Sequence, residues 1–356
     1  MGDVRLDGIE VCASWLTQRS FRAAHCSFLL PVTPANKEEA LAEFRRAGEL
    51  GKYSGLRVSG IADLSFLKGF PRLLYLEVVN QERVDTRQLD GLTNLRGLRL
   101  ESPGAGIDFA RFPLLEVFVG DWRPDNRNIH RSRELRQIRA WHFRPRSLDL
   151  ADLAGATRLE WLELTQTNIA SLSGVETLAD LRYLHVSYAP QLQALDALAA
   201  GHSGIRELGL GNARRVPSYL PIASLGHLRR LQLSSCAPMP DLKWTRGMDS
   251  LDFFSFVQTD VQDGDLSPLL SLPRLAYVGT MDKRHYNYKC DRLNELLQGR
   301  RAFSGPSVPT GQIEGAGGTA DNRSELALSW RGAWLEAPLL AARPRGRSPW
   351  VSTAAA

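Results

Sequence analysis

The sequence has little cysteine and no clustered histidine. Four cysteines occur in 356 residues, at positions 12, 26, 236 and 290, and their spacing matches neither a disulfide framework nor a zinc motif. We therefore expect free thiols, which are typical of a reducing compartment. The seven histidines are scattered, and the sequence contains neither HExxH nor CxxC. We expect no metal and no cofactor.

Long apolar runs are missing as well. No stretch approaches the roughly 18 apolar residues that a spanning helix needs, so we expect no membrane segment. The amino terminus, MGDVRLDGIE, lacks the basic start and apolar centre of a signal peptide. These absences favour a cytoplasmic location.

Groups arranged for catalysis are also absent from the sequence pattern. The only cysteines near a histidine are Cys26, beside His25, and Cys290, five residues after His285. A nucleophile needs a base and an orienting group within reach, and proximity in sequence does not create that geometry. Gly104 and Gly106 lack the third glycine and the following helix of a dinucleotide-binding loop. The sequence therefore predicts a protein that is not an enzyme.

Positive charge is modest in total but concentrated in one segment. The formal net charge is +5, and residues 123–146 hold eight arginines against Asp125 and Glu134. Trp122, Trp141 and Phe143 lie among these basic residues, a mixture that occurs in nucleic-acid-binding surfaces. The alternative is that the arginines form a solvated turn surface without a ligand.

Leucine, by contrast, is abundant and regularly spaced. Residues 159–186 read LEWLELTQTNIASLSGVETLADLRYLHV, in which the pattern LxxLxL recurs after 22 residues with conservative replacement. Alternate residues of a strand point to opposite faces, so the leucines of LxL point into a stack that no repeat can bury alone. Eleven first positions follow this register at intervals of 20 to 24 residues: Tyr53, Leu73, Leu95, Leu115, Leu135, Leu159, Leu181, Ile205, Leu228, Leu251 and Leu275.

The pattern resembles the internalin-type short leucine-rich repeats of bacteria and the related SDS22-like repeats, over about residues 53–285. The resemblance implies an α/β leucine-rich repeat solenoid that is curved, with a parallel sheet on the concave face and helical caps, and a protein that binds other proteins. The family's ladder asparagine is replaced here, and only threonine and cysteine could partly substitute for it. We expect irregularity over 103–146, where the repeats depart most. The replacing residues are Gln81, Pro103, Arg123, Phe143, Thr167, Ala189, Ala213, Cys236 and Thr259.

Four segments are expected along the chain. Residues 1–50 form an N-terminal cap region, with short strands in VRLDGIEV and CSFLLPV and an amphipathic helix in NKEEALAEFRRAGEL that has Asn36 as its N-cap. Residues 51–285 carry about eleven repeats. Residues 286–301 form a C-terminal capping helix that buries leucines 293, 296 and 297. The low-complexity composition of 302–356 is typical of a disordered tail.

Candidate binding residues come from the third, fifth and seventh positions of each repeat, which face the concave surface. Trp141, Trp161 and Tyr183 lie on three consecutive strands about 4.8 Å apart, so we expect one aromatic patch flanked by charged side chains. The alternative is that the tryptophans pack on a loop or on the N-terminal segment. The predicted partner-binding residues are Tyr75, Arg99, Glu101, Arg139, Trp141, Trp161, Glu163, Tyr183 and His185.

The sequence therefore predicts a non-catalytic, monomeric protein-binding scaffold. The partner could be a toxin domain, a host target or a signalling protein, which corresponds to a bacterial immunity, effector or regulatory role. The second class of function is nucleic-acid binding through residues 123–146.

Overall fold

A computed structural model describes residues 4–6, 9–13, 28–48, 53–104, 106–200 and 204–303. The tail expected over 302–356 therefore lies, from residue 304 onward, outside the described residues, as does the pair His25 and Cys26. Within the described ranges, fourteen strands form one sheet whose spatial order follows the chain. β1 and β2 pair antiparallel, as do β2 and β3, and every later neighbour pairs parallel.

The strand bounds show how closely the sheet follows the leucine register. Each strand from β4 to β14 begins two residues after one of the eleven first positions. The strands are β1 (Val4–Leu6), β2 (Ile9–Ala13), β3 (Phe28–Val32), β4 (Gly55–Ser59), β5 (Tyr75–Val79), β6 (Gly97–Glu101), β7 (Val117–Asp121), β8 (Gln137–Trp141), β9 (Trp161–Thr165), β10 (Tyr183–Ser187), β11 (Glu207–Gly211), β12 (Arg230–Ser234), β13 (Phe253–Ser255) and β14 (Tyr277–Gly279).

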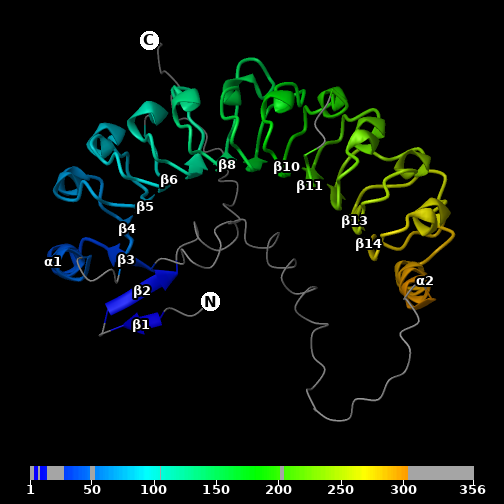
Figure 1. Ribbon diagram of the computed structural model, residues 1–356, viewed down its shortest axis with the longest axis horizontal. Helices are drawn as coiled ribbons and strands as arrows, with labels where there is room; N and C mark the ends of the chain where they lie inside the picture. The colour runs from blue at the N-terminus through cyan, green and yellow to red at the C-terminus, as the bar shows by residue number, and fades with distance from the viewer. Residues whose placement is uncertain are drawn as a thin grey trace, which may run out of the picture. The chain divides into compact units, whose positions relative to one another are not determined.

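Alternation along the strands separates the core from the concave face. The second residue of each strand from β4 to β14 is completely or almost completely buried, as with Leu76, Leu162 and Leu231 at 0% exposure. The first, third and fifth residues point to the other face of the sheet. Figure 1 shows these strands along the inner side of an arc, with short 3-10 helices on its outer side. The inner side is the concave face named below.

The 3-10 helices close the core from the outer side. Each contributes a buried residue that packs behind the strands, usually an apolar one and in η10 Thr245, whose hydroxyl donates to the Leu242 carbonyl at 2.8 Å. The helices are η2 (Ser65–Gly69), η3 (Thr86–Leu89), η4 (Phe109–Arg111), η5 (Ile129–Arg131), η6 (Ala151–Leu153), η7 (Val175–Thr177), η8 (Asp196–Leu198), η9 (Leu220–Ser224), η10 (Lys243–Thr245) and η11 (Ser267–Ser271).

Threonine and cysteine take over part of the missing asparagine ladder. The Thr259 hydroxyl accepts from the Cys236 backbone N–H at 3.0 Å and donates to the Leu233 carbonyl at 3.0 Å, while the Cys236 thiol donates to the Leu210 carbonyl at 3.2 Å. Thr167 donates to the Phe143 carbonyl at 2.6 Å. These bonds satisfy backbone groups of neighbouring repeats, as the ladder asparagine would.

The degenerate repeats over 103–146 are filled by aromatic side chains instead. Trp122 packs against Phe109, Phe118 and Phe143, with ring centroids 5.9, 6.3 and 5.2 Å apart. Aromatic contacts of this kind bury large apolar areas. The turn is therefore stabilised by ring packing, and Arg123 at the ladder position donates to the Ser102 carbonyl of the preceding repeat at 3.0 Å.

Strands β8 to β13 are followed by a residue with left-handed backbone geometry. Positive φ is unfavourable for residues other than glycine, by roughly 1 kcal/mol. In several repeats the left-handed residue donates its N–H to the carbonyl that ends the next strand, as Gln166 does to Ser187 at 3.0 Å. The lateral bond fixes the turn despite the local cost. The six residues are His142, Gln166, Tyr188, Asn212, Ser235 and Gln258.

Helices cover both ends of the described stack. α1 (Lys37–Gly48) buries Ala40, Leu41 and Ala47, and its Phe44 ring lies 5.5 Å from Phe70. The Asn36 side chain accepts from the Thr33 N–H at 2.7 Å, so this amide stabilises the preceding turn and not the first turn of the helix.

At the other end, α2 (Cys290–Phe303) buries Leu293 and Leu297 and leaves Leu296 partly exposed. The Asn294 amide accepts from the Val278 N–H and donates to the Val278 carbonyl, both at 2.8 Å. This side chain thus takes the place of a further strand beside β14.

Candidate functional site

The first residue of each strand forms a continuous row across the concave face, called the first row below. Register pairs each member with the first residue of the next strand. From β9 to β14 four of its six members are aromatic and one is arginine: Trp161, Tyr183, Glu207, Arg230, Phe253 and Tyr277. Residue types that dominate protein interfaces therefore gather in this half of the sheet.

Trp161 and Tyr183 form the start of a ring stack. Their ring centroids lie 3.3 Å apart with an interplanar angle of 11°, and the His185 ring stacks on Tyr183 at 4.3 Å and 15°. Gly209 makes room for this arrangement, because a Cβ at that position would lie 2.5 Å from the His185 ring. Trp161 is partly exposed, whereas Tyr183 and His185 are 6% and 8% exposed.

Trp141 does not join this stack. It is the last residue of β8, in register with Thr165, and so lies four residues further along the sheet than Trp161. Its ring packs against Val117 and Val119 of β7. The expected single patch of three rings is therefore wrong: Trp141 and Trp161 are offset by four residues along neighbouring strands and belong to different rows.

The predicted charged residues are divided between two groups. Arg139 and Glu163 are register neighbours joined by an ion pair of 2.8 Å, and Glu163 is in register with His185, so both lie beside the ring stack. Arg99 and Glu101 pair at 2.9 Å on β6.

Tyr75 lies on β5, next to the second charged group, with its pKa raised by burial. Strands β7 and β8 separate β5 and β6 from Trp161. Tyr75, Arg99 and Glu101 therefore do not form one cluster with the rings.

A second group on the first row was missed by sequence reasoning. The Arg230 guanidinium lies 5.6 Å from the centre of the Phe253 ring, and Phe253 stacks with Tyr277 at 5.4 Å. Burial raises the pKa of the neighbouring Glu207 carboxyl; Arg230 opposes this rise and Asp252 adds to it. Arg230, Phe253 and Tyr277 are the first residues of three consecutive strands, and this shared position is the signal that could have identified them.

Comparison with known proteins bears on the fold. No protein-family model matches the chain, and no curated protein matches it. The structure of an internalin (inlF) from Listeria monocytogenes matches with a TM-score of 0.54 at 18% identity, over 77% of each chain. The chain is a leucine-rich repeat protein.

Other solved structures with leucine-rich repeats match less closely in shape. An internalin C2 (inlC2) from Listeria monocytogenes is 20% identical over 66% of this chain and 83% of its own, with a TM-score of 0.35. The ectodomain of the Arabidopsis receptor kinase HAESA, in complex with an IDA peptide hormone, is 20% identical over 61% of this chain and 40% of its own, with a TM-score of 0.42. At these identities the likeness concerns the fold alone.

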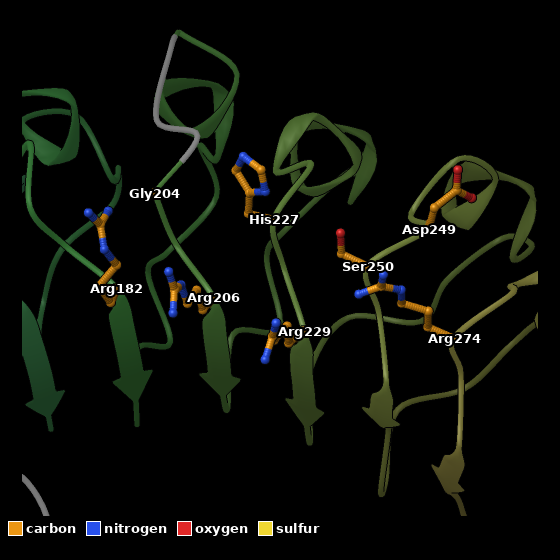
Figure 2. A pocket seen from close by; sticks show the side chains of 8 residues that line it. All are labelled: Arg182, Gly204, Arg206, His227, Arg229, Asp249, Ser250 and Arg274. Carbon is orange, nitrogen blue, oxygen red and sulfur yellow. The ribbon is translucent and has the colours of Figure 1, made fainter.

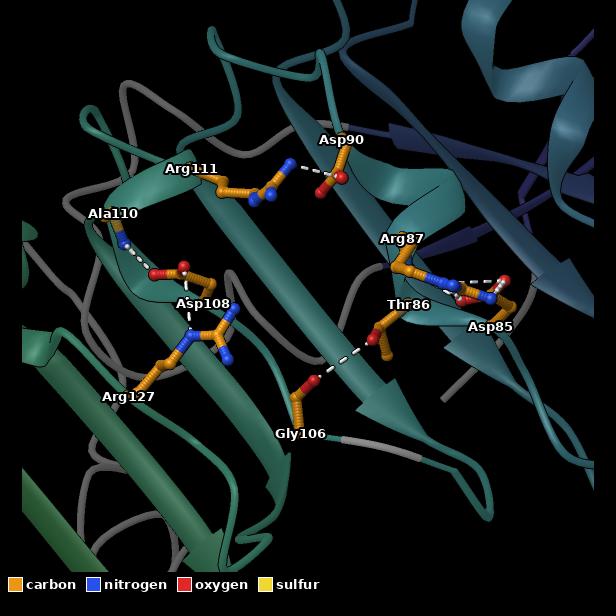
Figure 3. Close-up of polar contacts among 9 residues, drawn as sticks. All are labelled: Asp85, Thr86, Arg87, Asp90, Gly106, Asp108, Ala110, Arg111 and Arg127. Carbon is orange, nitrogen blue, oxygen red and sulfur yellow. Dashed lines mark hydrogen bonds and ion pairs between the residues drawn. The ribbon is translucent and has the colours of Figure 1, made fainter.

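In this leucine-rich repeat protein, half of the arginines in segment 123–146 are paired with carboxylates. Arg123 pairs with Asp121, Arg127 with Asp108, Arg136 with Glu160 and Arg139 with Glu163. Figure 3 shows the Arg127 pair beside the related contacts of Arg87 and Arg111 on the preceding repeats. Asp108 also accepts from the Ala110 N–H at the start of η4, so these arginines stabilise turns.

Groups for metal or covalent chemistry are not assembled in the described part of the repeat protein. There, no three potential ligands among His, Cys, Asp and Glu gather as a metal site would require. Cys236 and Cys290 are free thiols, and burial raises the pKa of Cys236 to about 11. No helix of the described ranges has the length and apolar character needed to cross a membrane.

Proposed function

We propose that this leucine-rich repeat protein is a non-catalytic scaffold that binds a protein partner through the first row between β9 and β14. One observation carries the proposal: Trp161, Tyr183, Phe253 and Tyr277 occupy equivalent positions on strands of one rigid sheet. The accessible parts of Trp161, Phe253 and Tyr277 offer contact area, the buried Tyr183 supports the Trp161 ring, and Arg230 and Glu207 add polar contacts. An extended protein segment is the ligand that matches a row of this kind.

The structural neighbours add support of a general kind. The leucine-rich repeat fold typically serves as a protein-binding scaffold, and the HAESA structure holds a peptide hormone. A cytoplasmic protein acting as a monomer remains our expectation for this chain. A toxin domain as partner would give it an immunity role, a host protein an effector role and a cellular signalling protein a regulatory role.

Photo-crosslinking from the sheet tests the location of the surface. A photoreactive amino acid at Ser255, the last residue of β13 and on the concave face, should capture a defined protein from cells that express the full chain. The same group at Leu220, which is 64% exposed on η9 at the outer side, should not capture that protein. Equal capture from both positions would contradict the proposed surface.

Binding measurements with the captured partner then test the residues. Trp161→Ala and Phe253→Ala should each weaken the affinity about tenfold or more, because aromatic anchors near the centre of an interface contribute 2 kcal/mol or so. Leu220→Ala is the matched control and should leave the affinity unchanged. Unchanged affinity in both aromatic variants would contradict the assignment of the first row.

A further inference from the structure

The residue that precedes each strand forms a second row, at the edge of the sheet where the strands begin. In the earlier repeats this edge row is neutralised by alternating charges. Arg96 pairs with Glu116 at 2.6 Å, and Arg136 pairs with Glu160. Two residues earlier in the repeat, Glu134 and Arg158 pair at 2.8 Å in the same way. Up to Glu160, therefore, the edge carries little net charge.

The alternation stops after Glu160. The next three members of the edge row are Arg182, Arg206 and Arg229, and within the described ranges none of them forms an ion pair with a carboxylate. Figure 2 shows the three side chains at the starts of β10, β11 and β12. They line an open groove of about 640 Å³ together with Arg274, His227 and other residues, and of its eight lining residues Asp249 alone is acidic.

Backbone hydrogen bonds hold the three arginines in line. The Arg206 N–H donates to the Arg182 carbonyl at 2.8 Å, and the Arg229 N–H donates to the Arg206 carbonyl at 2.8 Å. The spacing of neighbouring strands is about 4.8 Å, so the backbone positions from which the three arginine side chains extend span about 10 Å. Like charges held this close repel one another unless an anion lies between them.

Gly204 leaves space for the Arg182 guanidinium group. Gly204 lies one residue before Ile205, which is the first position of its repeat. A Cβ at position 204 would lie 2.1 Å from Arg182 Nη1. The equivalent residues of the flanking repeats are Asp180 and His227. The missing side chain lets the Arg182 guanidinium extend toward the Arg206 repeat and into the groove.

We propose that Arg182, Arg206 and Arg229 bind an oligophosphate, a ligand with two or more linked phosphate groups. Guanidinium groups donate paired hydrogen bonds that match phosphate oxygens, and three of them extending from backbone positions that span about 10 Å can each contact one of several linked phosphate groups. The basic stretch ends at Glu160 on one side and at Asp252 on the other, so it suits a short ligand better than a nucleic-acid strand. This site is separate from the first row and does not depend on its function.

Calorimetric titration of the full chain with inorganic tripolyphosphate at low salt tests the site. Saturable binding is expected, and tripolyphosphate should raise the melting temperature of the wild type. Arg206→Ala should lower the affinity about tenfold or more, because a hydrogen-bonded charge pair is lost. Gly204→Asp should also lower it, because a carboxylate then lies beside Arg182. Absence of saturable binding to the wild type overturns the proposal.

The matched control is Arg96→Ala, which removes an arginine at the same repeat position that is already paired with Glu116. It should leave the affinity unchanged, and a loss equal to that of Arg206→Ala would overturn the site. Tighter binding of a nucleoside triphosphate than of tripolyphosphate assigns the groove to nucleotides, and the reverse order assigns it to inorganic oligophosphates. A single-stranded oligonucleotide that binds more tightly than either overturns the assignment to a short ligand.

Discussion

At the scale of single residues, Thr259 shows how a repeat can function without the ladder asparagine. Thr259 is 1% exposed, and its hydroxyl connects two neighbouring repeats by accepting from the Cys236 N–H and donating to the Leu233 carbonyl. Burying backbone groups without partners is costly, so a small hydroxyl in the right place can replace a longer amide.

Replacing Thr259 by valine should lower the free energy of unfolding by about 2 kcal/mol, because both backbone partners lose their hydrogen bond in a buried site. Thr259→Ser keeps the hydroxyl and should retain most of the stability. Urea denaturation followed by circular dichroism measures both variants. No loss of stability in the valine variant, together with a loss in the serine variant, would show that packing of the methyl group matters and the hydrogen bonds do not.

Cys236 should react slowly with alkylating reagents in the folded protein. The thiolate is the reactive form, and a pKa of about 11 against the ordinary 9.0 makes it about a hundredfold rarer at pH 8. Mass spectrometry after treatment with iodoacetamide should therefore find Cys236 modified far more slowly than Cys290, which is partly exposed. Urea that unfolds the repeats should remove the difference. Equal rates in the native protein would contradict the burial of the thiol.

The residue scale is also where sequence reasoning was least complete. Counted from Leu135, Trp141 is the seventh residue of its repeat, and counted from Leu159, Trp161 is the third. Their separation along the sheet could therefore be inferred from the sequence. The packing of Trp141 against Val117 and Val119 could not be inferred, because it depends on which side chains of a neighbouring strand leave space for the ring. The row of Arg182, Arg206 and Arg229 could be predicted from the sequence, because arginine occupies the same position in three consecutive repeats.

At the scale of elements, α2 resolves a problem that every open parallel sheet has. The last strand presents backbone groups without a neighbouring strand, and Asn294 satisfies those of Val278 with one side-chain amide. Arg300 adds a hydrogen bond to the Leu272 carbonyl at 2.8 Å, beside η11. The helix thus contributes polar partners as well as its buried leucines.

Asn294→Ala should lower the free energy of unfolding by about 1–2 kcal/mol, because two hydrogen bonds to Val278 are lost. Amide hydrogen exchange should show the Val278 N–H exchanging faster than in the wild type. Arg292→Ala is the matched control on the same helix, since it removes only an exposed pair with Glu295 and should cost less than about 0.5 kcal/mol. Similar losses for both variants would contradict the role of the amide.

The elements themselves were predictable because burial sets the register. Every strand from β4 to β14 starts at a fixed distance from its leucine position, since shifting a strand by one residue would turn its apolar side chains to the concave face. Irregularity was expected over 103–146, but β7 and β8 continue the sheet in register there. The aromatic filling of this segment around Trp122 requires knowledge of which turns approach each other.

At the scale of the whole molecule, charge is distributed in pairs across most repeats and in excess at a few places. In segment 123–146 the pairs of Arg123, Arg127, Arg136 and Arg139 leave four arginines to interact with an external anion: Arg131, Arg133, Arg144 and Arg146. The local excess of positive charge is thus smaller than the composition suggests.

This distribution limits any binding of duplex DNA through segment 123–146. With at most four phosphate contacts, the logarithm of the association constant should fall with the logarithm of salt concentration with a slope no steeper than about −4. Fluorescence anisotropy with a labelled duplex over a range of salt concentrations measures the slope. A steeper slope would show that the paired arginines also contact phosphates and would restore nucleic-acid binding as the main function.

The end of the sheet at β14 has a consequence for how molecules of this protein behave in a crowded solution. A bare terminal strand is a template onto which a second chain can add its own, and head-to-tail additions that do not close into a ring grow into filaments. One amide at position 294 occupies that template. The same side chain that completes the fold of one molecule therefore also denies the Val278 backbone groups to a second chain.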